Sequence, residues 1–449
     1  MFEPNSRAHF IGVGGAGMSA IAKVLVERGV RVSGSDLKRS RAATTLEAIG
    51  ARITIGHSAS LVDGADVVVV SRAIPATNPE LRRAEELGIP VVPRGDALAA
   101  VLHGSRSIIV AGTHGKTTTS SMVATILREA GLDPTYLIGA GLNDVGSNAR
   151  AGRGDLSVAE SDESDGSFLQ LEPFVGVVTN IELDHVDYWG DLEAVRDGFR
   201  RFAERIRPDG ALVVPVEERD LADVSSIRTF GDGGDIVAEA VRPVPGGSRF
   251  DLSDGVRSFD VMLRVPGLHN IANALAAAAA CAAAGLDLQT VATGLQRFTG
   301  VERRFQVRGE AGGVTVVDDY AHHPTEVRAT LAAARAGEWQ RVLALFQPHR
   351  YSRTAAFKED FGSAFDDADR IVVTDVYGAG EQPVPGVTGK LIADAICEHI
   401  PGRSVAYIPH RTELVSYLEK SCRSGDVLLT LGAGDVNSVG EELLARLSR

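Results

Sequence analysis

The sequence predicts an α/β protein of three domains, each built around a mostly parallel sheet. Short apolar strands alternate with helices along most of the 449 residues, which is the pattern of doubly wound sheets. Two glycine-rich turns, near residues 12 and 112, each join a strand to a helix and so indicate two nucleotide-binding units. The length also exceeds what one hydrophobic core usually holds. We therefore expect domains at 1–105, 106–307 and 308–449.

Composition and charge argue against a nucleic-acid partner. Hydrophobic residues make up 44% of the chain and charged residues 23%, which is typical of globular proteins. The formal net charge of -13 opposes binding to phosphate backbones. Cys281, Cys397 and Cys422 lack the spacing of a metal site, so we expect packing roles in a reducing cytoplasm. No signal peptide is recognisable, and the most apolar run, 271–286, is too short to span a bilayer.

The first 105 residues are predicted to form a mononucleotide-binding domain. The turn at 12–17 has the G-x-G-x-x-G spacing of a diphosphate-binding loop and lies between a strand and a helix. A second strand ends at Asp36, where an acid would contact a ribose, and a later strand ends near Ser71. Taken alone, the pattern suggests a dinucleotide site. Close packing of a strand-to-helix turn is the structural alternative, because it also favours glycine.

The second domain opens on a predicted phosphate loop. A buried strand leads into the glycine turn 112–115, and a helix begins at Lys116. Bare N–H groups and the positive end of the helix dipole suit a phosphate, Lys116 would reach its outer oxygens, and the Thr117 hydroxyl would hold Mg²⁺. Val110 stands where the general phosphate-loop pattern has its first glycine, which indicates a class narrower than a generic NTPase. A tight turn without a ligand is the alternative.

Two groups of polar side chains follow later strands of this domain. The first comprises Glu160, Asp162, Glu163 and Asp165. The second comprises Glu182, Asp184, His185 and Asp187. Carboxylate oxygens suit Mg²⁺ and would neutralise charge on a transferring phosphoryl group. Any one of these residues alone would more simply be a solvated loop residue, but two groups at strand ends beside a phosphate loop favour a metal site.

The remaining segments predict an insertion and a third α/β unit. Residues 211–265 are expected to form a small antiparallel addition. In the alanine-rich helix that follows, Asn273 could read a base edge together with His269 and Asn270, although capping of the helix by Asn270 is favoured by residue type. In the third domain, Arg350 and Arg353 follow a strand and could grip a carboxylate, or they could be isolated surface arginines.

Several stretches of the sequence resemble the Mur ligases, the ATP-dependent enzymes that build the peptide of bacterial cell-wall precursors. These stretches are FIGVGGAGMSAIAKVL, SRAIP, AGTHGKTTTS, ESDESDGSF, TNIELDHVD, GLHNIANALAAAAA, DDYAHHPTEV and FQPHRYSRT. The resemblance implies a ligation that passes through an acyl phosphate and serves peptidoglycan synthesis in the cytoplasm. It also implies ATP and Mg²⁺ as cofactors, UDP-N-acetylmuramate and L-alanine as substrates, no nucleic acid or membrane partner, and a monomer or weak homodimer.

The resemblance further implies roles for individual residues. The ATP site would comprise Gly112, Thr113, His114, Gly115, Lys116, Thr117, Thr118, Asn273, Arg304 and Asp319. The UDP-sugar site would comprise Gly12, Gly14, Gly15, Ala16, Gly17, Met18, Asp36 and Ser71. The amino-acid pocket would comprise Tyr320, His322, Arg350 and Arg353. The metal ligands would be Thr117, Glu160 and His185, and the catalytic residues would be Lys116, His322 and Arg304.

Other functions fit parts of the sequence. The first domain alone suggests a nicotinamide-dependent oxidoreductase, and the phosphate loop alone suggests a switch or motor. A relative that joins a whole peptide to the same sugar is the nearest rival among ligases, although the close pair Arg350 and Arg353 favours a single amino acid. Several Mur ligases bridge metal ions with a carbamoylated lysine. Here no lysine occurs between Lys116 and Lys358, so that bridge cannot form.

Overall fold

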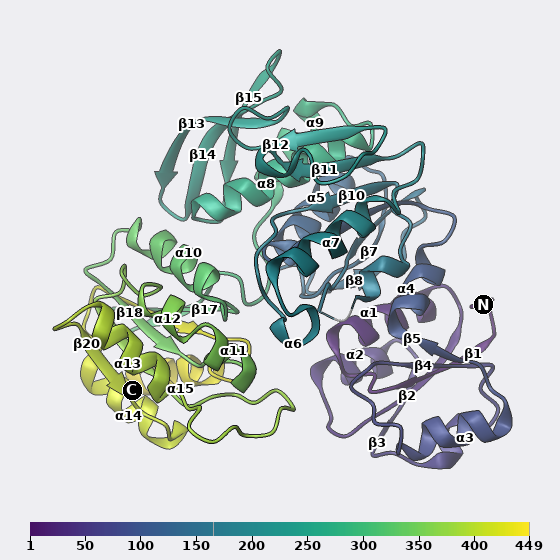
Figure 1. Cartoon of the computed structure of the whole chain (residues 1–449), viewed down its shortest axis with the longest axis horizontal. Coiled ribbons are helices and arrows are strands. Elements are labelled where there is room, and N and C mark those ends of the chain that lie inside the picture. The colour runs from purple at the N-terminus through teal and green to yellow at the C-terminus, as the bar shows by residue number, and fades with distance from the viewer. Residues whose placement is uncertain (165, 449) are drawn as a thin grey trace.

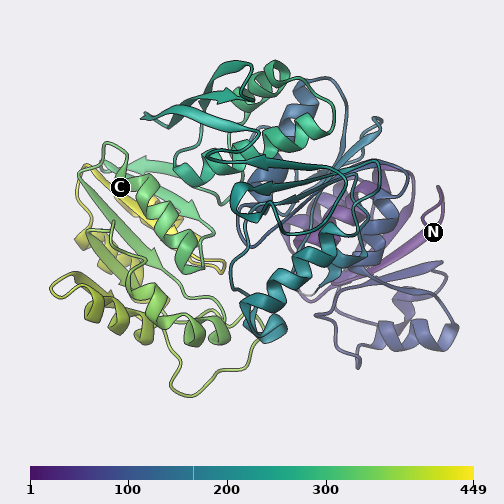
Figure 2. The same ribbon diagram turned by 45° about the horizontal axis from the view of Figure 1, so that its top comes forward.

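The computed structural model describes residues 1–164 and 166–448, and these form three α/β units in chain order. In Figure 1 the N-terminal unit is purple to blue, the central unit blue to teal, and the C-terminal unit green to yellow. The view in Figure 2 also places the central unit against both of the others. The predicted fold class is confirmed.

The N-terminal unit is a five-stranded parallel sheet with strand order β3-β2-β1-β4-β5. Its strands are β1 (Arg7–Ile11), β2 (Arg31–Asp36), β3 (Arg52–Ile55), β4 (Val67–Val70) and β5 (Val91–Pro93). Its helices are α1 (Ala16–Glu27), α2 (Arg41–Ala48), the 3-10 turn η1 (Ala59–Val62), α3 (Pro79–Leu87) and α4 (Arg94–Leu102). The strand order reverses between β1 and β4. The first glycine turn therefore stands at the switch point where such sheets bind ligands.

The central unit is a seven-stranded sheet with order β12-β11-β10-β6-β9-β7-β8. Its strands are β6 (Arg106–Ala111), β7 (Thr135–Leu137), β8 (Ala149–Arg150), β9 (Leu156–Glu160), β10 (Val175–Val178), β11 (Ala211–Pro215) and β12 (Ile227–Phe230). Its helical elements are α5 (Lys116–Glu129), η2 (Ser167–Gln170), α6 (Val186–Trp189), α7 (Leu192–Ala203), η3 (Val216–Glu218), α8 (Leu268–Ala283) and α9 (Leu288–Arg297). Because β6 runs parallel between β9 and β10, the phosphate loop lies beside both polar groups.

The predicted antiparallel addition at 211–265 is wrong in its first part. β11 and β12 are parallel strands that extend the central sheet. Only β13 (Val237–Val244), β14 (Gly247–Ser253) and β15 (Ser258–Leu263) form a separate antiparallel sheet. The sequence of β11, ALVVP, is a continuous apolar run of the kind that parallel strands buried on both faces have, whereas β15 alternates.

The alanine-rich helix α8 packs against α5, the helix of the phosphate loop. The alanines from 276 to 280 are all fully buried, so the contact is made almost without long side chains. Asn270 does not cap this helix, because the helix begins at Leu268 with Gly267 at its N-cap. The amide of Asn270 instead donates to the carbonyl of Pro266 at 2.7 Å. Residue type predicted a cap here, but the turn before the helix needs the positive φ of 98° that glycine adopts.

The C-terminal unit is a six-stranded sheet with order β16-β17-β21-β18-β19-β20, in which only β16 is antiparallel. Its strands are β16 (Gln306–Ala311), β17 (Val314–Asp319), β18 (Arg341–Phe346), β19 (Arg370–Val373), β20 (Ser404–Tyr407) and β21 (Asp426–Leu431). Its helices are α10 (Pro324–Arg335), α11 (Tyr351–Ala356), α12 (Lys358–Gly362), α13 (Lys390–His399), α14 (Arg411–Ser421) and α15 (Asn437–Leu447).

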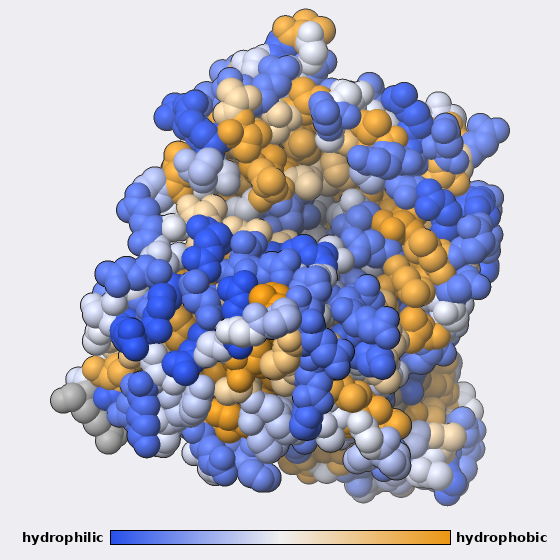
Figure 3. Space-filling model, turned by 60° about the vertical axis from the view of Figure 1, so that its left-hand side comes forward, coloured by the Kyte–Doolittle hydropathy of each residue, from blue (hydrophilic) through white to orange (hydrophobic). Residues whose placement is uncertain are grey.

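The surface is mostly hydrophilic in the face shown in Figure 3, with hydrophobic side chains in scattered groups. Within residues 1–164 and 166–448, no helix has the length and apolar character needed to cross a membrane. Cys281 is buried in the packing role that the sequence predicts. Cys397 is exposed, so the predicted packing role is wrong for that residue.

Candidate active site between three domains

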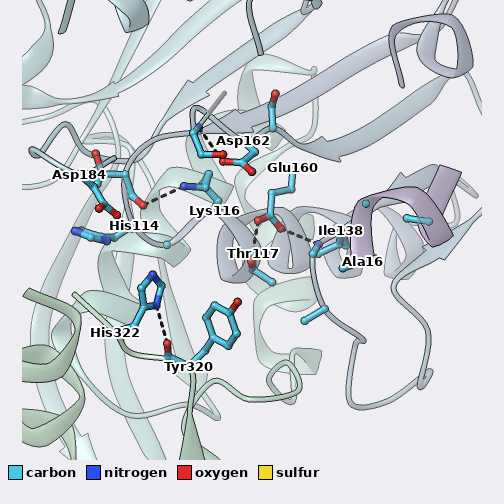
Figure 4. Close-up of a pocket in the computed structure, with 18 of the residues that line it drawn as sticks. Ala16, His114, Lys116, Thr117, Ile138, Glu160, Asp162, Asp184, Tyr320 and His322 are labelled. Atoms are coloured by element: carbon cyan, nitrogen blue, oxygen red, sulfur yellow. Dashed lines mark hydrogen bonds between the residues drawn. The ribbon is translucent and has the colours of Figure 1, made fainter. Parts of the chain in front are cut away.

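A cavity of about 590 Å³ lies where the three units meet. Figure 4 shows Lys116, Thr117 and Glu160 of the central unit on one side and Tyr320 and His322 of the C-terminal unit on the other. The lining also includes the predicted site residues Ala16, Gly17, Thr113, His114, Gly115, His185, Arg304, Arg350 and Arg353. The other predicted site residues stand behind this lining or away from it; they are Gly12, Gly14, Gly15, Met18, Asp36, Ser71, Gly112, Thr118, Asn273 and Asp319.

The phosphate loop has the predicted strand, turn and helix, and two of its positions require glycine. Gly112 and Gly115 have φ of 125° and 79°. A Cβ on Gly112 would lie 2.1 Å from Oγ1 of Thr179, and a Cβ on Gly115 would lie 2.2 Å from Oδ1 of Asn273. Asn273 thus contacts the turn from behind and also accepts from the hydroxyl of Thr119 at 3.3 Å. Asn273, which was predicted to read the base, therefore packs against the phosphate loop and stabilises it.

Lys116 is held by the protein's own oxygens. Its Nζ donates to the carbonyls of Gly112 at 2.6 Å and Thr113 at 3.0 Å, and it lies 2.8 Å from Oε2 of Glu163. Desolvation opposes the charge on Lys116, but the carboxylates, Glu163 first among them, outweigh this effect and raise its pKa. Glu163 is 2% exposed, and burial raises its pKa to about 7 even beside this ammonium group.

The predicted metal ligands lie next to this lysine. Oε1 of Glu160 accepts from the hydroxyl of Thr117 at 3.0 Å, and its Oε2 accepts from the backbone N–H of Gly139 at 2.8 Å. Nε2 of His185 lies 3.8 Å from Oε1 of Glu163. Burial lowers the pKa of His185, which favours the neutral imidazole that a metal requires.

The donor set fits a divalent cation that prefers oxygen ligands. Ligand atoms of Asp162, Glu163 and His185 lie within 4.8 Å of one another. Asp162 and Glu163 thus bring two carboxylates close together, and a bound dication would compensate their charge. From this acidic stretch, the family resemblance predicts only Glu160 as a metal ligand. The spacing of the acids gives no sign that Glu163 would also lie at the metal site. Asp165, the last acid of the stretch, lies outside the described residues.

On the C-terminal side, His322 has a defined tautomer. Its Nδ1 lies 2.8 Å from the carbonyl oxygen of Tyr320 and must donate to it. The remaining nitrogen, Nε2, is therefore an acceptor in the neutral ring. Burial lowers the pKa of His322 to about 3, so the ring stays neutral at physiological pH.

The two predicted carboxylate-binding arginines have different surroundings. Arg353 is 5% exposed and donates to both carboxylate oxygens of Asp184, at 3.0 and 2.9 Å. Among the described residues, the guanidinium of Arg350 makes longer ion pairs, at 3.6 Å to Asp187 and 3.8 Å to Glu381. Arg350 is thus the more available of the two for an incoming anion.

Glu326 is a site residue that sequence reasoning missed. Its carboxylate lies 3.5 Å from Nδ1 of His114, 3.6 Å from Nη1 of Arg304 and 3.2 Å from Nδ1 of His322. It also completes the capping box of α10. Its signal in the sequence, an acid three residues after the N-cap position, predicts a cap and nothing more. The fold alone brings it between the phosphate loop and the predicted amino-acid pocket.

Asp319, a predicted ribose contact, is 5% exposed and orders the connection between two units. Its two oxygens accept from the backbone N–H groups of Phe305 at 2.7 Å and Ala321 at 2.8 Å. Burial raises the pKa of Asp319 to about 6. These bonds fix the backbone directly after Arg304 and directly after Tyr320, and the guanidinium of Arg304 lies 5.2 Å from the centre of the Tyr320 ring.

The N-terminal glycine turn faces the cavity through Ala16 and Gly17. Behind it, the N–H of Gly14 donates to Oδ2 of Asp36 at 2.9 Å, and a Cβ on Gly14 would lie 2.8 Å from that oxygen. Asp36 therefore shapes the turn in addition to standing at the predicted ribose position. Arg94, which no motif indicated, lines the cavity beside Gly17.

Comparison with protein-family models gives matches along the chain. Residues 7–106 match the Mur ligase family catalytic domain, residues 110–281 the Mur ligase middle domain, and residues 303–434 the Mur ligase glutamate ligase domain.

Curated relatives match over their full length. The UDP-N-acetylmuramate–L-alanine ligase of Rubrobacter xylanophilus is 50% identical, with 98% of this chain and all of the relative aligned. The enzyme of the same name from Geobacter sp. strain M21 is 46% identical, with 100% and 99% aligned. Among solved structures, the UDP-N-acetylmuramate-alanine ligase of Thermotoga maritima superposes with a TM-score of 0.82 at 31% identity, covering 98% of each chain.

Proposed function

Because the chain belongs to the Mur ligase family, we propose that it joins L-alanine to the lactyl carboxylate of UDP-N-acetylmuramate. ATP would be converted to ADP and phosphate, and the product would be UDP-N-acetylmuramoyl-L-alanine. The relatives that bear this enzyme's name align with nearly the entire chain. The reaction is a step of peptidoglycan precursor synthesis, which we place in the cytoplasm.

One observation carries this proposal: a single cavity is bordered by the glycine turn of the first unit, the phosphate loop of the second and the pocket of the third. A ligase needs a carboxylate, a phosphoryl donor and an amine in one place. An oxidoreductase would leave the phosphate loop without a role. A switch or motor would leave the first and third units without one.

In the first step, the lactyl carboxylate attacks the γ-phosphate of ATP in line, and ADP leaves. Both reactants are anionic, so Lys116 and Arg304 lower the barrier by stabilising charge. Thr117, Glu160 and His185, with Asp162 and Glu163 beside them, would hold Mg²⁺, which neutralises phosphate charge when bound. Lys116 reaches the phosphate once its contact with Glu163 gives way.

In the second step, the neutral amine of the amino acid attacks the acyl phosphate. The tetrahedral adduct expels phosphate and leaves an amide. Nε2 of His322 accepts a hydrogen bond from the amine and so orients its lone pair. A ring whose pKa is about 3 is a poor proton acceptor, so the role of His322 is to position the nucleophile, and the proton passes to water or to the departing phosphate.

The carboxylate of the amino acid is assigned to Arg350. Arg353 is already satisfied by Asp184, so it holds the wall of the pocket between two units. Tyr320 closes the same pocket from the side of Arg304.

The test is phosphate release with UDP-N-acetylmuramate, ATP and Mg²⁺, with L-alanine, glycine, L-serine and a tripeptide in separate reactions. We expect release that depends on both the sugar nucleotide and L-alanine. No release with any acceptor would refute a ligase, and preference for the tripeptide would assign the chain to the peptide-joining relatives. Release without the sugar nucleotide would indicate a switch or motor.

A further inference from the structure

A second group of potential metal ligands lies in the seam between the central and C-terminal units. It comprises His114 of the phosphate loop, Glu182 of the loop after β10, and His323 directly before α10. One ligand atom of each lies within 4.8 Å of those of the other two. None of the three belongs to the Mg²⁺ ligands assigned above.

The two histidines carry unsatisfied ring nitrogens. Within residues 1–164 and 166–448, Nε2 of His114 and Nε2 of His323 are buried without a hydrogen-bond partner. His323 is only 5% exposed, and the centroids of the two rings are 4.7 Å apart. Buried polar atoms are nearly always paired, so two such nitrogens in one seam call for a ligand.

We propose that His114, Glu182 and His323 bind a transition-metal dication of the Zn²⁺ class. Two imidazoles and one carboxylate form a ligand set that Zn²⁺ uses, with the fourth position left for water. Tetrahedral bonds of about 2.0–2.2 Å separate ligand atoms by about 3.3–3.6 Å. Nε2 of His114 and Oε2 of Glu182 are 3.5 Å apart, close to that spacing.

The groups around the three ligands support a dication. Glu326 faces Nδ1 of His114 at 3.5 Å, so it can orient this ring from behind, and the hydroxyl of Thr325 donates to Oε2 of Glu182 at 2.7 Å. Glu182 and Glu326 each place a carboxylate oxygen 3.5 Å from a ring nitrogen of His114. The two carboxylates therefore favour positive charge here, and a metal ion would supply it.

Binding has one structural cost. Nδ1 of His323 accepts from the N–H of Thr325 at 3.4 Å, and coordination through either ring nitrogen would remove that acceptor. The lost bond is long. The start of α10 keeps the other bond of its capping box, because Glu326 accepts from the N–H of His323 at 3.4 Å and also from that of His322 at 3.0 Å.

The ligands come from two units, so a bound ion would tie the phosphate loop to the C-terminal unit. Domain movement during turnover would then be hindered. This consequence rests on the proposed ligase function, whereas metal binding itself does not.

The test uses the full-length, nucleotide-free protein stripped of metal and titrated with Co²⁺, whose visible absorption distinguishes four-coordinate from six-coordinate sites. We expect one intense four-coordinate band, which Zn²⁺ abolishes. His323→Gln and Glu182→Gln should each weaken Co²⁺ binding at least about tenfold. His399→Gln, on a side chain that is 47% exposed, should bind like the wild type.

His185→Gln separates this site from the one predicted for Mg²⁺ and should leave the band in place. A band lost in that variant but kept in His323→Gln would overturn the proposal, as would the absence of any four-coordinate band. Thermal unfolding and ADP binding check that each variant is folded. In the ligase assay at excess Mg²⁺, Zn²⁺ should inhibit the wild type more than His323→Gln. If the protein is not a ligase, the inhibition assay gives no result. The Co²⁺ titration does not depend on ligase activity and still tests the metal site.

Discussion

Lys116 shows how the fold keeps a single lysine of the site charged. Two backbone carbonyls and Glu163 occupy its three N–H donors. When a nucleotide binds, phosphate oxygens therefore replace protein oxygens around Nζ of Lys116, and the amine does not need to gain a proton. The sequence predicted the lysine from its loop, but the partner Glu163 is set by the fold.

Replacing Lys116 with alanine should reduce turnover at least about 1,000-fold, since charge stabilisation of the transferring phosphoryl group would be lost. Binding of UDP-N-acetylmuramate should stay nearly unchanged, because that site is assigned to the first unit. Phosphate release and calorimetric titration measure the two effects. Lys358→Ala, at an exposed position, is the matched control. If Lys116→Ala loses both turnover and binding of UDP-N-acetylmuramate, the two nucleotide sites are misassigned.

The pKa of Glu163 predicts a pH effect on stability in Mg²⁺-free buffer. Burial raises this pKa to about 7 from 4.5, so the folded protein binds more protons than the unfolded chain between those values. Its contribution to stability is complete below the lower pKa and is lost as pH rises through the upper one. Urea unfolding across this range should show a fall that Glu163→Gln reduces and that added Mg²⁺ offsets. Identical pH profiles for the two proteins would contradict the assignment.

At the scale of elements, strands and turns were predictable where a local pattern determines them. The phosphate loop, the glycine turn at 12–17 and the alanine-rich helix lie where the sequence places them. The sheet that residues 211–230 join was not predictable, since a short apolar run does not reveal which sheet it belongs to. Asp319 and Asn273 lie outside the cavity lining and bond to the backbone or to the phosphate loop, because burial and partners depend on contacts between distant segments.

Gly115 tests whether the turn of the phosphate loop needs both its backbone conformation and its open space. Gly115→Ala would bring a methyl group against Asn273, so we expect ADP binding at least about tenfold weaker. Gly131 has a similar φ of 74°, and among the described residues no heavy atom beyond its chain neighbours lies within 4 Å of the place a Cβ would take there, which makes Gly131→Ala a matched control. The control should cost about 1 kcal/mol of stability and leave nucleotide binding unchanged. Equal binding defects in both variants would show that strain alone matters.

At the scale of the whole molecule, the pair of Asp184 and Arg353 joins the central and C-terminal units. Both side chains are buried, so Asp184→Asn leaves an uncompensated guanidinium and should destabilise the protein by about 3–5 kcal/mol. The exposed pair of Arg249 and Asp260 provides the control, since Asp260→Asn should cost less than about 1 kcal/mol. Urea unfolding measures both. A small loss in Asp184→Asn would mean that this pair does not hold the two units together.

The buried alanines of α8 have a consequence for the genetics of the protein. A single C-to-T transition turns any alanine codon into a valine codon. At positions 276–280, where every alanine is fully buried, the added methyl groups would overpack the contact and cost about 1–3 kcal/mol. A protein of ordinary marginal stability survives such a loss when cool and not when warm. This helix is therefore where conditional, heat-sensitive alleles should arise.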